Sequence, residues 1–415
     1  MKVLMLTQFF PPELCAASNR NAAVAAQLLQ AGHDVHVLTG FPNFPTGVIP
    51  AAYRGRLSTH ELVEGIRTTR LWTFASPRRS GALRLLNWAS LAGSASLYLV
   101  APREPMDVLY VSSPPITLAM PALLGAMPRG TRLVVDIRDS YPEVAIRMGM
   151  WRASSPLARV VGAVAQALYH RADCVVAVTE SVREEIVARG CDPEKILVAP
   201  NGYDRVEPDA RPPFSRRRGE FVAVFVGNFG LAAGVDVILD AAALLRDDAR
   251  IRIVLVGDGS EFQRVHARAG AERLSNVELL GALSRPAAMA ALGAADLCLV
   301  PLKRNLVDSL PTKLFDALSV GCPVLVSAGG EARRFVERSG GGWSVSPEEP
   351  QALAAALRAI VDAPAERAKR AAVGRSYVEE RYARARSAAS IVARIEELVG
   401  RPWAAAQDDA EKASA

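Results

Sequence analysis

Short apolar runs alternate along most of the chain with longer stretches rich in Ala and Leu. Near the start, residues 2–9 (KVLMLTQF) and 34–40 (DVHVLTG) flank an amphipathic stretch from Asn19 to Gln30 that is closed by Ala-Gly. This strand–helix–strand order is typical of a parallel sheet. The same pattern predicts further strands, each ending in polar, Gly or Pro residues, within residues 107–115, 131–139, 173–181 and 195–204.

The pattern stops after Asp204. Residues 205–219 are rich in Pro and charge and have no apolar periodicity, which indicates a linker. A second series of apolar runs then follows within residues 221–230, 251–261, 276–283, 296–303, 323–330 and 342–347. We therefore predict an α/β protein with two Rossmann-like domains, residues 1–204 and 220–384, a closing helix at 385–402 and a disordered tail at 403–415. Ligands bind at the carboxyl ends of parallel strands, so we expect both sheets to face a central cleft.

The bulk composition narrows the possible partners. The chain has 415 residues, of which 50% are hydrophobic, and a formal net charge of +6. Excess positive charge favours a phosphate-bearing ligand, nucleic acid or an anionic membrane. Basic residues are scattered, and the one tight cluster, Arg216 to Arg218, lies in the linker, so we expect no nucleic-acid binding.

Cysteine and histidine usage indicates neither disulfides nor a metal site. The five cysteines form no CxxC pair, the five histidines show no ligand spacing, and no DxD triplet occurs. His33 lies at the entry of a predicted strand and His36 at its end, and we expect a structural role for both. The first residues read as a strand rather than a signal peptide, which favours a cytoplasmic protein.

Residues 85–102 carry no charge for 18 positions. Asn87, three serines and a glycine make this segment less apolar than a good spanning helix. A helix buried inside the domain remains open, and so does a helix on the membrane surface, with Trp88 and nearby arginines at the headgroups.

Polar residues that follow the strands of the second domain form a set suited to phosphate. Glycines let backbone N–H groups approach an anion, and helix N-termini add positive potential. The residues are Asn228, Gly230, Gly257, Asp258, Gly281 and Lys303. Taken singly, GDGSE can also be an ordinary turn that caps the helix after it.

The stretch DSLPTKLFDALSVGCP, residues 308–323, combines charge with a packed helix. Pro311 suits the first turn of a helix that runs to Gly321. Asp308 would then precede the helix, and Asp316 would lie about one turn inside it. Both carboxylates and Lys313 could meet at the helix N-terminus, although a solvated Lys313–Asp316 salt bridge is an alternative.

Several motifs together resemble one enzyme family. The order VAVTES, NGYD, FVGNFG, IVLVGDGSE, NVELLGAL and D(x7)DALSVGCPVLVSAGG is similar to the family 4 glycosyltransferases, which have the two-domain GT-B fold. LTQFFPPE, LTGFPNFPTG, SSPP and VDIRDSYPEV resemble the branch that makes bacterial surface polysaccharides, including O-antigen, colanic acid and N-acetyl-L-fucosamine transferases.

This resemblance implies roles for the acidic pair. Family members have two glutamates that flank seven residues, and here Asp308 and Asp316 stand in that spacing. Asp316 would hold the ribose hydroxyls and Asp308 would face the donor sugar. The family's usual Arg and Lys after the first strand of the second domain are replaced by Asn228 and Ala233. Lys313, with Lys303 nearby and backbone N–H groups around Thr312, is then expected to hold the diphosphate.

The resemblance also implies roles for residues of the first domain. Asp139 or Glu143, in the DSYPE that replaces the branch's DLWPE, would orient the acceptor hydroxyl or assist its deprotonation, and Glu13 competes for this role. The loop PPELCAASNRN would close over the diphosphate through Asn19 or Arg20. Ser18 can instead be a simple helix cap.

The expected function is retaining transfer of a sugar, an N-acetylated hexosamine or deoxyhexosamine, from a UDP-linked donor to a polyprenyl-diphosphate-linked saccharide. Such an enzyme needs no metal cofactor and would lie on the inner face of the cytoplasmic membrane. One alternative is a UDP-sugar 2-epimerase of the same fold. Release of UDP only when an acceptor is added would argue against it. A second alternative is a non-catalytic GT-B partner protein, and donor binding without sugar transfer would support it.

Overall fold

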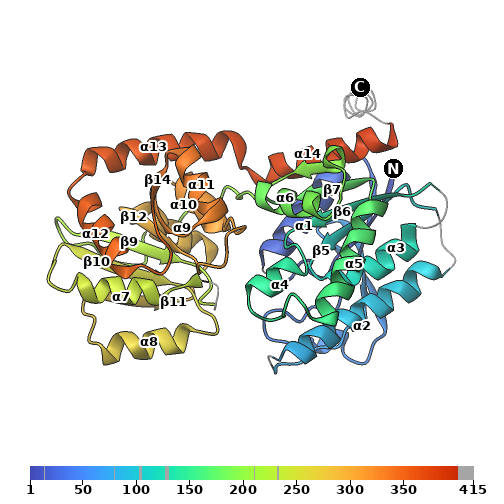
Figure 1. The fold of residues 1–415 in the computed structure, drawn as a ribbon, viewed down its shortest axis with the longest axis horizontal. Coiled ribbons are helices and arrows are strands. Elements are labelled where there is room, and N and C mark those ends of the chain that lie inside the picture. The colour runs from blue at the N-terminus through green and yellow to red at the C-terminus, as the bar shows by residue number, and fades with distance from the viewer. Residues whose placement is uncertain are drawn as a thin grey trace. The chain divides into compact units, whose positions relative to one another are not determined.

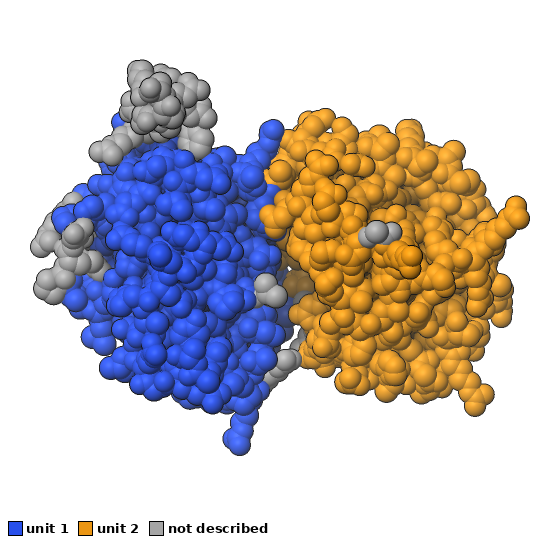
Figure 2. Space-filling view, turned by 180° about the vertical axis from the view of Figure 1, so that it is seen from behind, with its two compact units in different colours: residues 1–201, 384–415 blue, residues 202–383 orange. Residues whose placement is uncertain are grey.

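The computed structural model describes residues 1–13, 15–78, 80–101, 105–126, 130–209, 211–230 and 233–400. The chain divides into two compact units, each built on its own sheet (Figure 1). Unit 1 comprises residues 1–201 and 384–415, and unit 2 comprises residues 202–383 (Figure 2). Both units are α/β, as the alternation of apolar runs predicts.

Unit 1 contains an eight-stranded sheet in the order β3-β4-β2-β1-β5-β6-β7-β8. All neighbouring strands are parallel except β3 and β4. The strands are β1 (Lys2–Leu6), β2 (Asp34–Gly40), β3 (Ser58–Val63), β4 (Ile66–Leu71), β5 (Val108–Ser113), β6 (Arg132–Ile137), β7 (Cys174–Ala177) and β8 (Ile196–Val198). The central strands are buried on both faces, which explains their continuous apolar runs.

The β3–β4 hairpin is absent from the sequence-based expectation. Its edge strand alternates between exposed and half-buried residues and therefore carries no apolar run. The turn is made by Glu64 and Gly65, which both have positive φ, the backbone that a tight two-residue hairpin needs.

Helices cover both faces of this sheet. The face packed by α1 (Ala16–Gln30) and α14 (Arg384–Val399) forms one apolar cluster, and the opposite face, packed by α2 (Gly81–Val100), α3 (Ala119–Ala126) and α5 (Pro156–Arg171), forms another. The remaining helices of unit 1 are α4 (Glu143–Arg147), α6 (Glu180–Ala188) and the 3-10 turns Ala51–Tyr53, Ile116–Leu118 and Pro193–Lys195. Helix α1 begins earlier than predicted because Cys15 caps it through Ser18 N, at 3.5 Å from Cys15 Sγ.

The C-terminal helix returns to unit 1. Ile391, Val392 and Ile395 of α14 pack into the cluster beneath α1. His33 Nε2 lies 2.8 Å from Glu396 Oε1, and both side chains are buried. His33 therefore joins α14 to the N-terminal part of unit 1.

A buried ion pair crosses the same face of unit 1. Arg20 of α1 donates to both carboxylate oxygens of Asp136, at 2.6 and 2.9 Å, and to the Pro200 carbonyl at 3.0 Å. Tyr110 Oη donates to Asp136 Oδ2 at 2.7 Å. Burial raises the pKa of the Tyr110 hydroxyl, and the Asp136 charge raises it further, so the phenol stays protonated as a donor. The carboxylate is thus fully enclosed by its partners.

Unit 2 contains a six-stranded parallel sheet in the order β11-β10-β9-β12-β13-β14. The strands are β9 (Phe221–Val226), β10 (Ile251–Val256), β11 (Val277–Gly281), β12 (Leu297–Pro301), β13 (Val324–Ser327) and β14 (Gly342–Val345). Helices α7 (Asp236–Leu244), α8 (Phe262–Ala271) and α12 (Pro350–Val361) pack one face. The other face carries α9 (Arg285–Ala294), α10 (Thr312–Ser319), α11 (Gly330–Ser339) and α13 (Pro364–Arg381).

The unit boundaries fall at residues 201/202 and 383/384. The segment expected to be a linker, residues 205–219, groups with unit 2, since Phe214 packs in a unit 2 cluster and Arg216 Nη1 donates to the Ala294 carbonyl at 2.9 Å. The expected tail, residues 403–415, lies outside the described residues. Among the described helices, none combines the length and apolarity needed to cross a membrane.

The Arg20–Asp136 pair predicts a large loss of stability on substitution. Asp136→Asn leaves the Arg20 guanidinium buried without its counter-charge, so we expect unit 1 to lose about 3 to 5 kcal/mol. Denaturant-dependent hydrogen exchange at β5 and β6 amides measures this loss without assuming that the two units unfold together.

Asp34→Asn is the matched control, because the Asp34–Arg67 pair is well exposed. It should cost less than about 1 kcal/mol. Equal costs for the two substitutions would show that the buried pair contributes no more than a surface pair.

Candidate active site

The strand order of the unit 2 sheet reverses at β9. The chain passes from β9 to β10 and β11 on one side, and β12 lies on the other side of β9. Open parallel sheets bind ligands at such a reversal, outside the carboxyl ends of the strands. The residues to examine are therefore those that follow β9 and β12.

Lys313 reaches this point from the first turn of α10. Its Nζ lies over the Phe225 ring, 3.9 Å from the ring centroid, near the end of β9. A Cβ placed on Gly227, the residue after β9, would come within 2.6 Å of the same Nζ. Gly227 has φ +151° and is the residue that leaves room for the ammonium.

The ammonium of Lys313 lacks an acidic partner among the residues that the structure describes. The residue as a whole keeps partial solvent exposure, but the charged end is enclosed by protein. Burial lowers the pKa of Lys313 to about 8. The alternative reading, a solvated Lys313–Asp316 salt bridge, is not found between these two described residues, and Asp316 contacts Arg285. A cation without a described counter-charge, at the point where the strand order reverses, is suited to an anionic ligand.

The glycine-rich loops after β9 and β10 pack against each other. A Cβ on Gly257 would lie 1.8 Å from the Gly227 carbonyl oxygen, and one on Gly259 would lie 2.2 Å from Asn228 Oδ1. The Gly257 N–H donates to the Gly281 carbonyl at 2.7 Å. Gly257 and Gly281 therefore have a structural role in joining these loops, whatever they contribute to ligand binding.

The other residues predicted to bind the donor lie around this edge. Asn228 and Asp258 are exposed, as is Lys303, which follows β12. Gly230 and Thr312 are half-buried, and Thr312 opens α10 directly after Pro311. Pro311 thus precedes the helix instead of occupying its first turn.

The residue before Asp308, Val307, makes a tight backbone contact. The neighbouring Val307 carbonyl accepts the Glu331 N–H at 2.7 Å, at the N-terminus of α11. A Cβ on Gly330, which has φ +57°, would lie 1.9 Å from that carbonyl oxygen. The Gly-Gly-Glu sequence after β13 thereby anchors the loop that carries Asp308, which is 8% exposed.

Asp316 contacts Arg285, a residue that the sequence did not point to. Arg285 Nη2 donates to Asp316 Oδ1 at 3.2 Å. Arg285 opens α9 four residues after Gly281, beyond the polar residues that directly follow the strand. The Ser-Arg-Pro start of that helix was the available signal. Arg285 fixes the side chain that is expected to face the ribose.

Unit 1 has a corresponding reversal between β1 and β5. Buried polar atoms collect near the carboxyl ends of these strands and have no hydrogen-bond partner among the residues that the structure describes. They are Gln8 Oε1, Glu13 Oε2, Ser18 Oγ, Ser112 Oγ and Ser113 Oγ. Unsatisfied buried polar atoms are uncommon in folded proteins and indicate a place for water or ligand.

Glu13 is one of these residues. Its Oε1 accepts the backbone N–H groups of Asn43 and Phe44, both at 2.9 Å. Burial raises the pKa of Glu13, against the lowering effect of those two bonds and of Arg70. Glu13 therefore shapes the loop after β2 and still presents one unpaired carboxylate oxygen.

The three loop residues expected to contact the ligand differ in exposure. Asn19 is half-buried, whereas Ser18 is fully buried and Arg20 is 2% exposed. The bonds of Arg20 to Asp136 and Pro200 favour a structural role over the diphosphate contact expected from the sequence. Ser18 is not the helix cap, because Cys15 takes that position.

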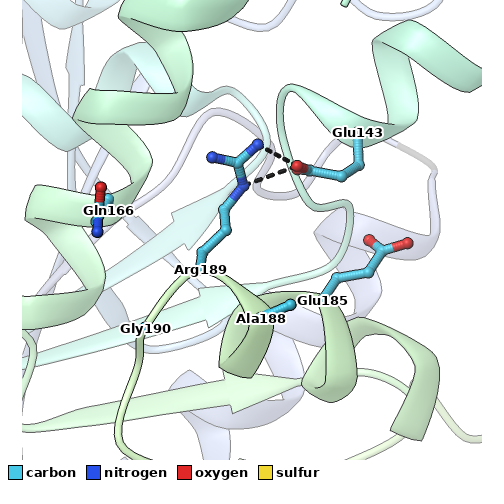
Figure 3. A pocket seen from close by; sticks show the side chains of 6 residues that line it. All are labelled: Glu143, Gln166, Glu185, Ala188, Arg189 and Gly190. Carbon is cyan, nitrogen blue, oxygen red and sulfur yellow. Dashed lines mark hydrogen bonds and ion pairs between the residues drawn. The ribbon is translucent and has the colours of Figure 1, made fainter.

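Asp139 and Glu143 follow β6 but have different surroundings. Glu143 at the start of α4 accepts from Arg189 Nε at 2.7 Å, and Arg189 Nη2 contacts the same oxygen (Figure 3). The pair borders a cavity of about 600 Å³ that is also lined by Gln166 and Glu185. Asp139 lies near Tyr141, whose pKa is raised to about 12 by burial and by the Asp139 charge. The contact with Arg189 would have to open before Glu143 could act as a base.

Across the described ranges, no group of three or more His, Cys, Asp and Glu side chains is arranged to hold a metal ion.

Comparison with known proteins identifies the family. Residues 17–202 match the family described as "Glycosyl transferase 4-like domain", and residues 206–376 match "Glycosyl transferases group 1". The chain belongs to the family 4 glycosyltransferases and has the GT-B fold. The two matches follow one another along most of the chain.

Individual relatives and solved structures agree with this assignment. WcaI of Escherichia coli (strain K12), named for colanic acid biosynthesis, is 26% identical over 91% of this chain and 96% of its own. Sucrose-phosphate synthase from Thermosynechococcus elongatus superposes with a TM-score of 0.76 at 18% identity, covering 96% of this chain and 100% of that one. Anabaena HepE in complex with UDP-glucose superposes with a TM-score of 0.65 at 17% identity, covering 96% and 99%.

The anchor at Gly330 predicts a local effect of a single methyl group. Gly330→Ala places a Cβ against the Val307 carbonyl and forces a left-handed backbone on alanine. We expect a cost of at least about 1 to 2 kcal/mol from the backbone alone. Thermal unfolding measures the cost, and glycosyltransferase activity should fall as the Asp308 loop shifts.

Gly329→Ala is the control, since a Cβ there meets nothing within 4 Å. Its φ of −100° is open to any residue. If the two variants behave alike, the close approach to Val307 does not position the loop.

Proposed function

We propose that the protein is a retaining glycosyltransferase of bacterial surface polysaccharide assembly. It would transfer an N-acetylated hexosamine or deoxyhexosamine from a UDP-linked donor to a polyprenyl-diphosphate-linked saccharide. The observation that carries this proposal is the unpaired Lys313 ammonium at the strand-order reversal of unit 2. The names of the relatives, which include a colanic acid transferase, support the role in polysaccharide assembly.

The donor would bind unit 2 through its diphosphate. Lys313 and the N-terminus of α10 would stabilise the negative charge that develops on the leaving nucleoside diphosphate. HepE, which has the same fold, binds UDP and UDP-glucose, and this supports a UDP-linked donor here. Asp316, oriented by Arg285, would accept hydrogen bonds from the ribose hydroxyls, and Asp308 would face the sugar.

The acceptor would bind unit 1, at the strand-order reversal where buried polar atoms lack partners. Asp139 or Glu143 would orient the acceptor hydroxyl or take its proton. Glu13 is a further candidate for this role. Burial raises its pKa, which favours action as a base. A lipid-linked acceptor would place the protein on the inner face of the cytoplasmic membrane. Transfer without a metal cofactor remains a prediction.

The low pKa of Lys313 predicts how UDP binding depends on pH. The ammonium is present below pH 8 and is lost as the pH rises through about 8 in the ligand-free protein. UDP affinity should therefore fall as the pH rises above about 8, with proton uptake on binding in that range. Titration calorimetry with UDP at several pH values, in buffers of different ionisation enthalpy, measures both effects.

Lys313→Met should weaken UDP binding roughly 10- to 100-fold and remove the fall above pH 8. The ligand-free fold should not lose stability, because the substitution removes a buried unpaired charge. Lys369→Met, on an exposed position of α13, is the control and should bind UDP as the native chain does. Native-like UDP affinity in Lys313→Met would contradict the proposed donor site.

A further inference from the structure

The outward side of α2 is almost free of charge. Leu86 is 48% exposed, Leu97 is 74% exposed, and Val100 at the end of the helix is also exposed. Arg84 is the one charged residue of this 20-residue helix. The exposed side of a surface helix normally carries charged and polar residues. Helix α2 is therefore not buried on all sides, and its exposed side is more apolar than that of an ordinary solvated helix.

The two neighbouring helices continue this character. Helix α3 packs beside α2, and α5 packs beside α3, on one face of the unit 1 sheet (Figure 1). We define the apolar helical face as the exposed large apolar residues of these three helices. They are Leu85, Leu86, Leu97, Val100, Met120, Leu124, Leu157 and Val160. Large contiguous apolar surface marks an interaction site.

The charges of the three helices have one sign. None of α2, α3 and α5 contains Asp or Glu. Arg84 and Arg159 are exposed, and neither has an acidic partner among the described residues. Cations without acids, set among exposed aliphatic side chains, complement an anionic surface that also accepts apolar groups.

An apolar cavity adjoins α2. Ser94 Oγ of α2 donates to the Trp72 carbonyl at 2.9 Å, and Trp72 lines a cavity of about 320 Å³. Arg54 and Arg56 lie at the same cavity and have no acidic partner in the described part of the chain. Aromatic and aliphatic lining beside two arginines repeats the combination of apolar and cationic groups.

We infer that the apolar helical face docks on an anionic lipid bilayer, with its leucines in the interfacial region and Arg84 and Arg159 at the headgroups. The inference names the surface that meets the membrane and does not rest on the proposed sugar transfer. Interfacial binding scales with the buried apolar area plus attraction to anionic lipid. A protein partner would need acidic and apolar groups arranged to match this face. An anionic bilayer supplies negative charge and apolar groups over any area.

Vesicle co-sedimentation tests the inference. The native chain should sediment with vesicles of phosphatidylcholine mixed with phosphatidylglycerol and much less with phosphatidylcholine alone. Added salt should weaken the binding. Leu86→Glu/Leu97→Glu should lower the partition coefficient by roughly tenfold for each leucine removed. Arg84→Gln/Arg159→Gln should lower it only on the anionic vesicles.

Leu244→Glu/Val373→Glu is the matched control, since these residues are 44% and 46% exposed on helices of unit 2. It should sediment as the native chain does. UDP binding, measured on every variant, should be unchanged, so failure of the donor site and failure of the membrane face are told apart. Native-like sedimentation of the leucine variant would overturn the inference. The inference would also be overturned if the leucine variant still bound vesicles but changed its oligomeric state, as measured by light scattering. That result would assign the face to a second copy of the chain.

Discussion

An ammonium group enclosed by protein without a counter-charge is the constraint on which the carboxyl edge of unit 2 depends. Lys313 extends from α10 to the end of β9, where Phe225 lies beneath its Nζ and Gly227 leaves the space beside it. A side chain at position 227 or a shift of α10 would close this space. Keeping an unpaired charge there costs stability, and an anion bound at this edge would offset that cost.

At the same edge, backbone contacts set the positions of the loops that carry the predicted site residues. Gly257 fits against the Gly227 carbonyl, and Gly330 fits against the Val307 carbonyl. The first contact joins the loops after β9 and β10, and the second fixes the loop of Asp308. Glycine is needed at both places because a Cβ would lie within 2 Å of a carbonyl oxygen. The acidic pair is thus positioned by chain packing, and Arg285 orients its second member.

The sequence predicts the fold well where burial is two-sided. Strands such as β5 and β9 contain continuous apolar runs, whereas the half-exposed β3 begins with four polar residues, so an apolar run does not reveal it. Site residues are predicted less completely, because their roles depend on partners from distant segments. Arg20 reads as a loop cation but meets Asp136, which is 116 residues away. Arg285 and Asp316, 31 residues apart, meet only once the sheet is formed.

The return of α14 to unit 1 makes unit 2 an insertion in the chain of unit 1. Arg384 Nη1 donates to the Asn201 carbonyl at 2.8 Å, so the two ends of the interrupted unit adjoin each other. Tyr203 and Ala383 pair as a bridge in the same way inside unit 2. Each unit therefore has neighbouring ends and could be excised or grafted as a module. Removal of α14 would expose apolar residues of the unit 1 sheet to solvent and leave the unit 2 sheet unchanged.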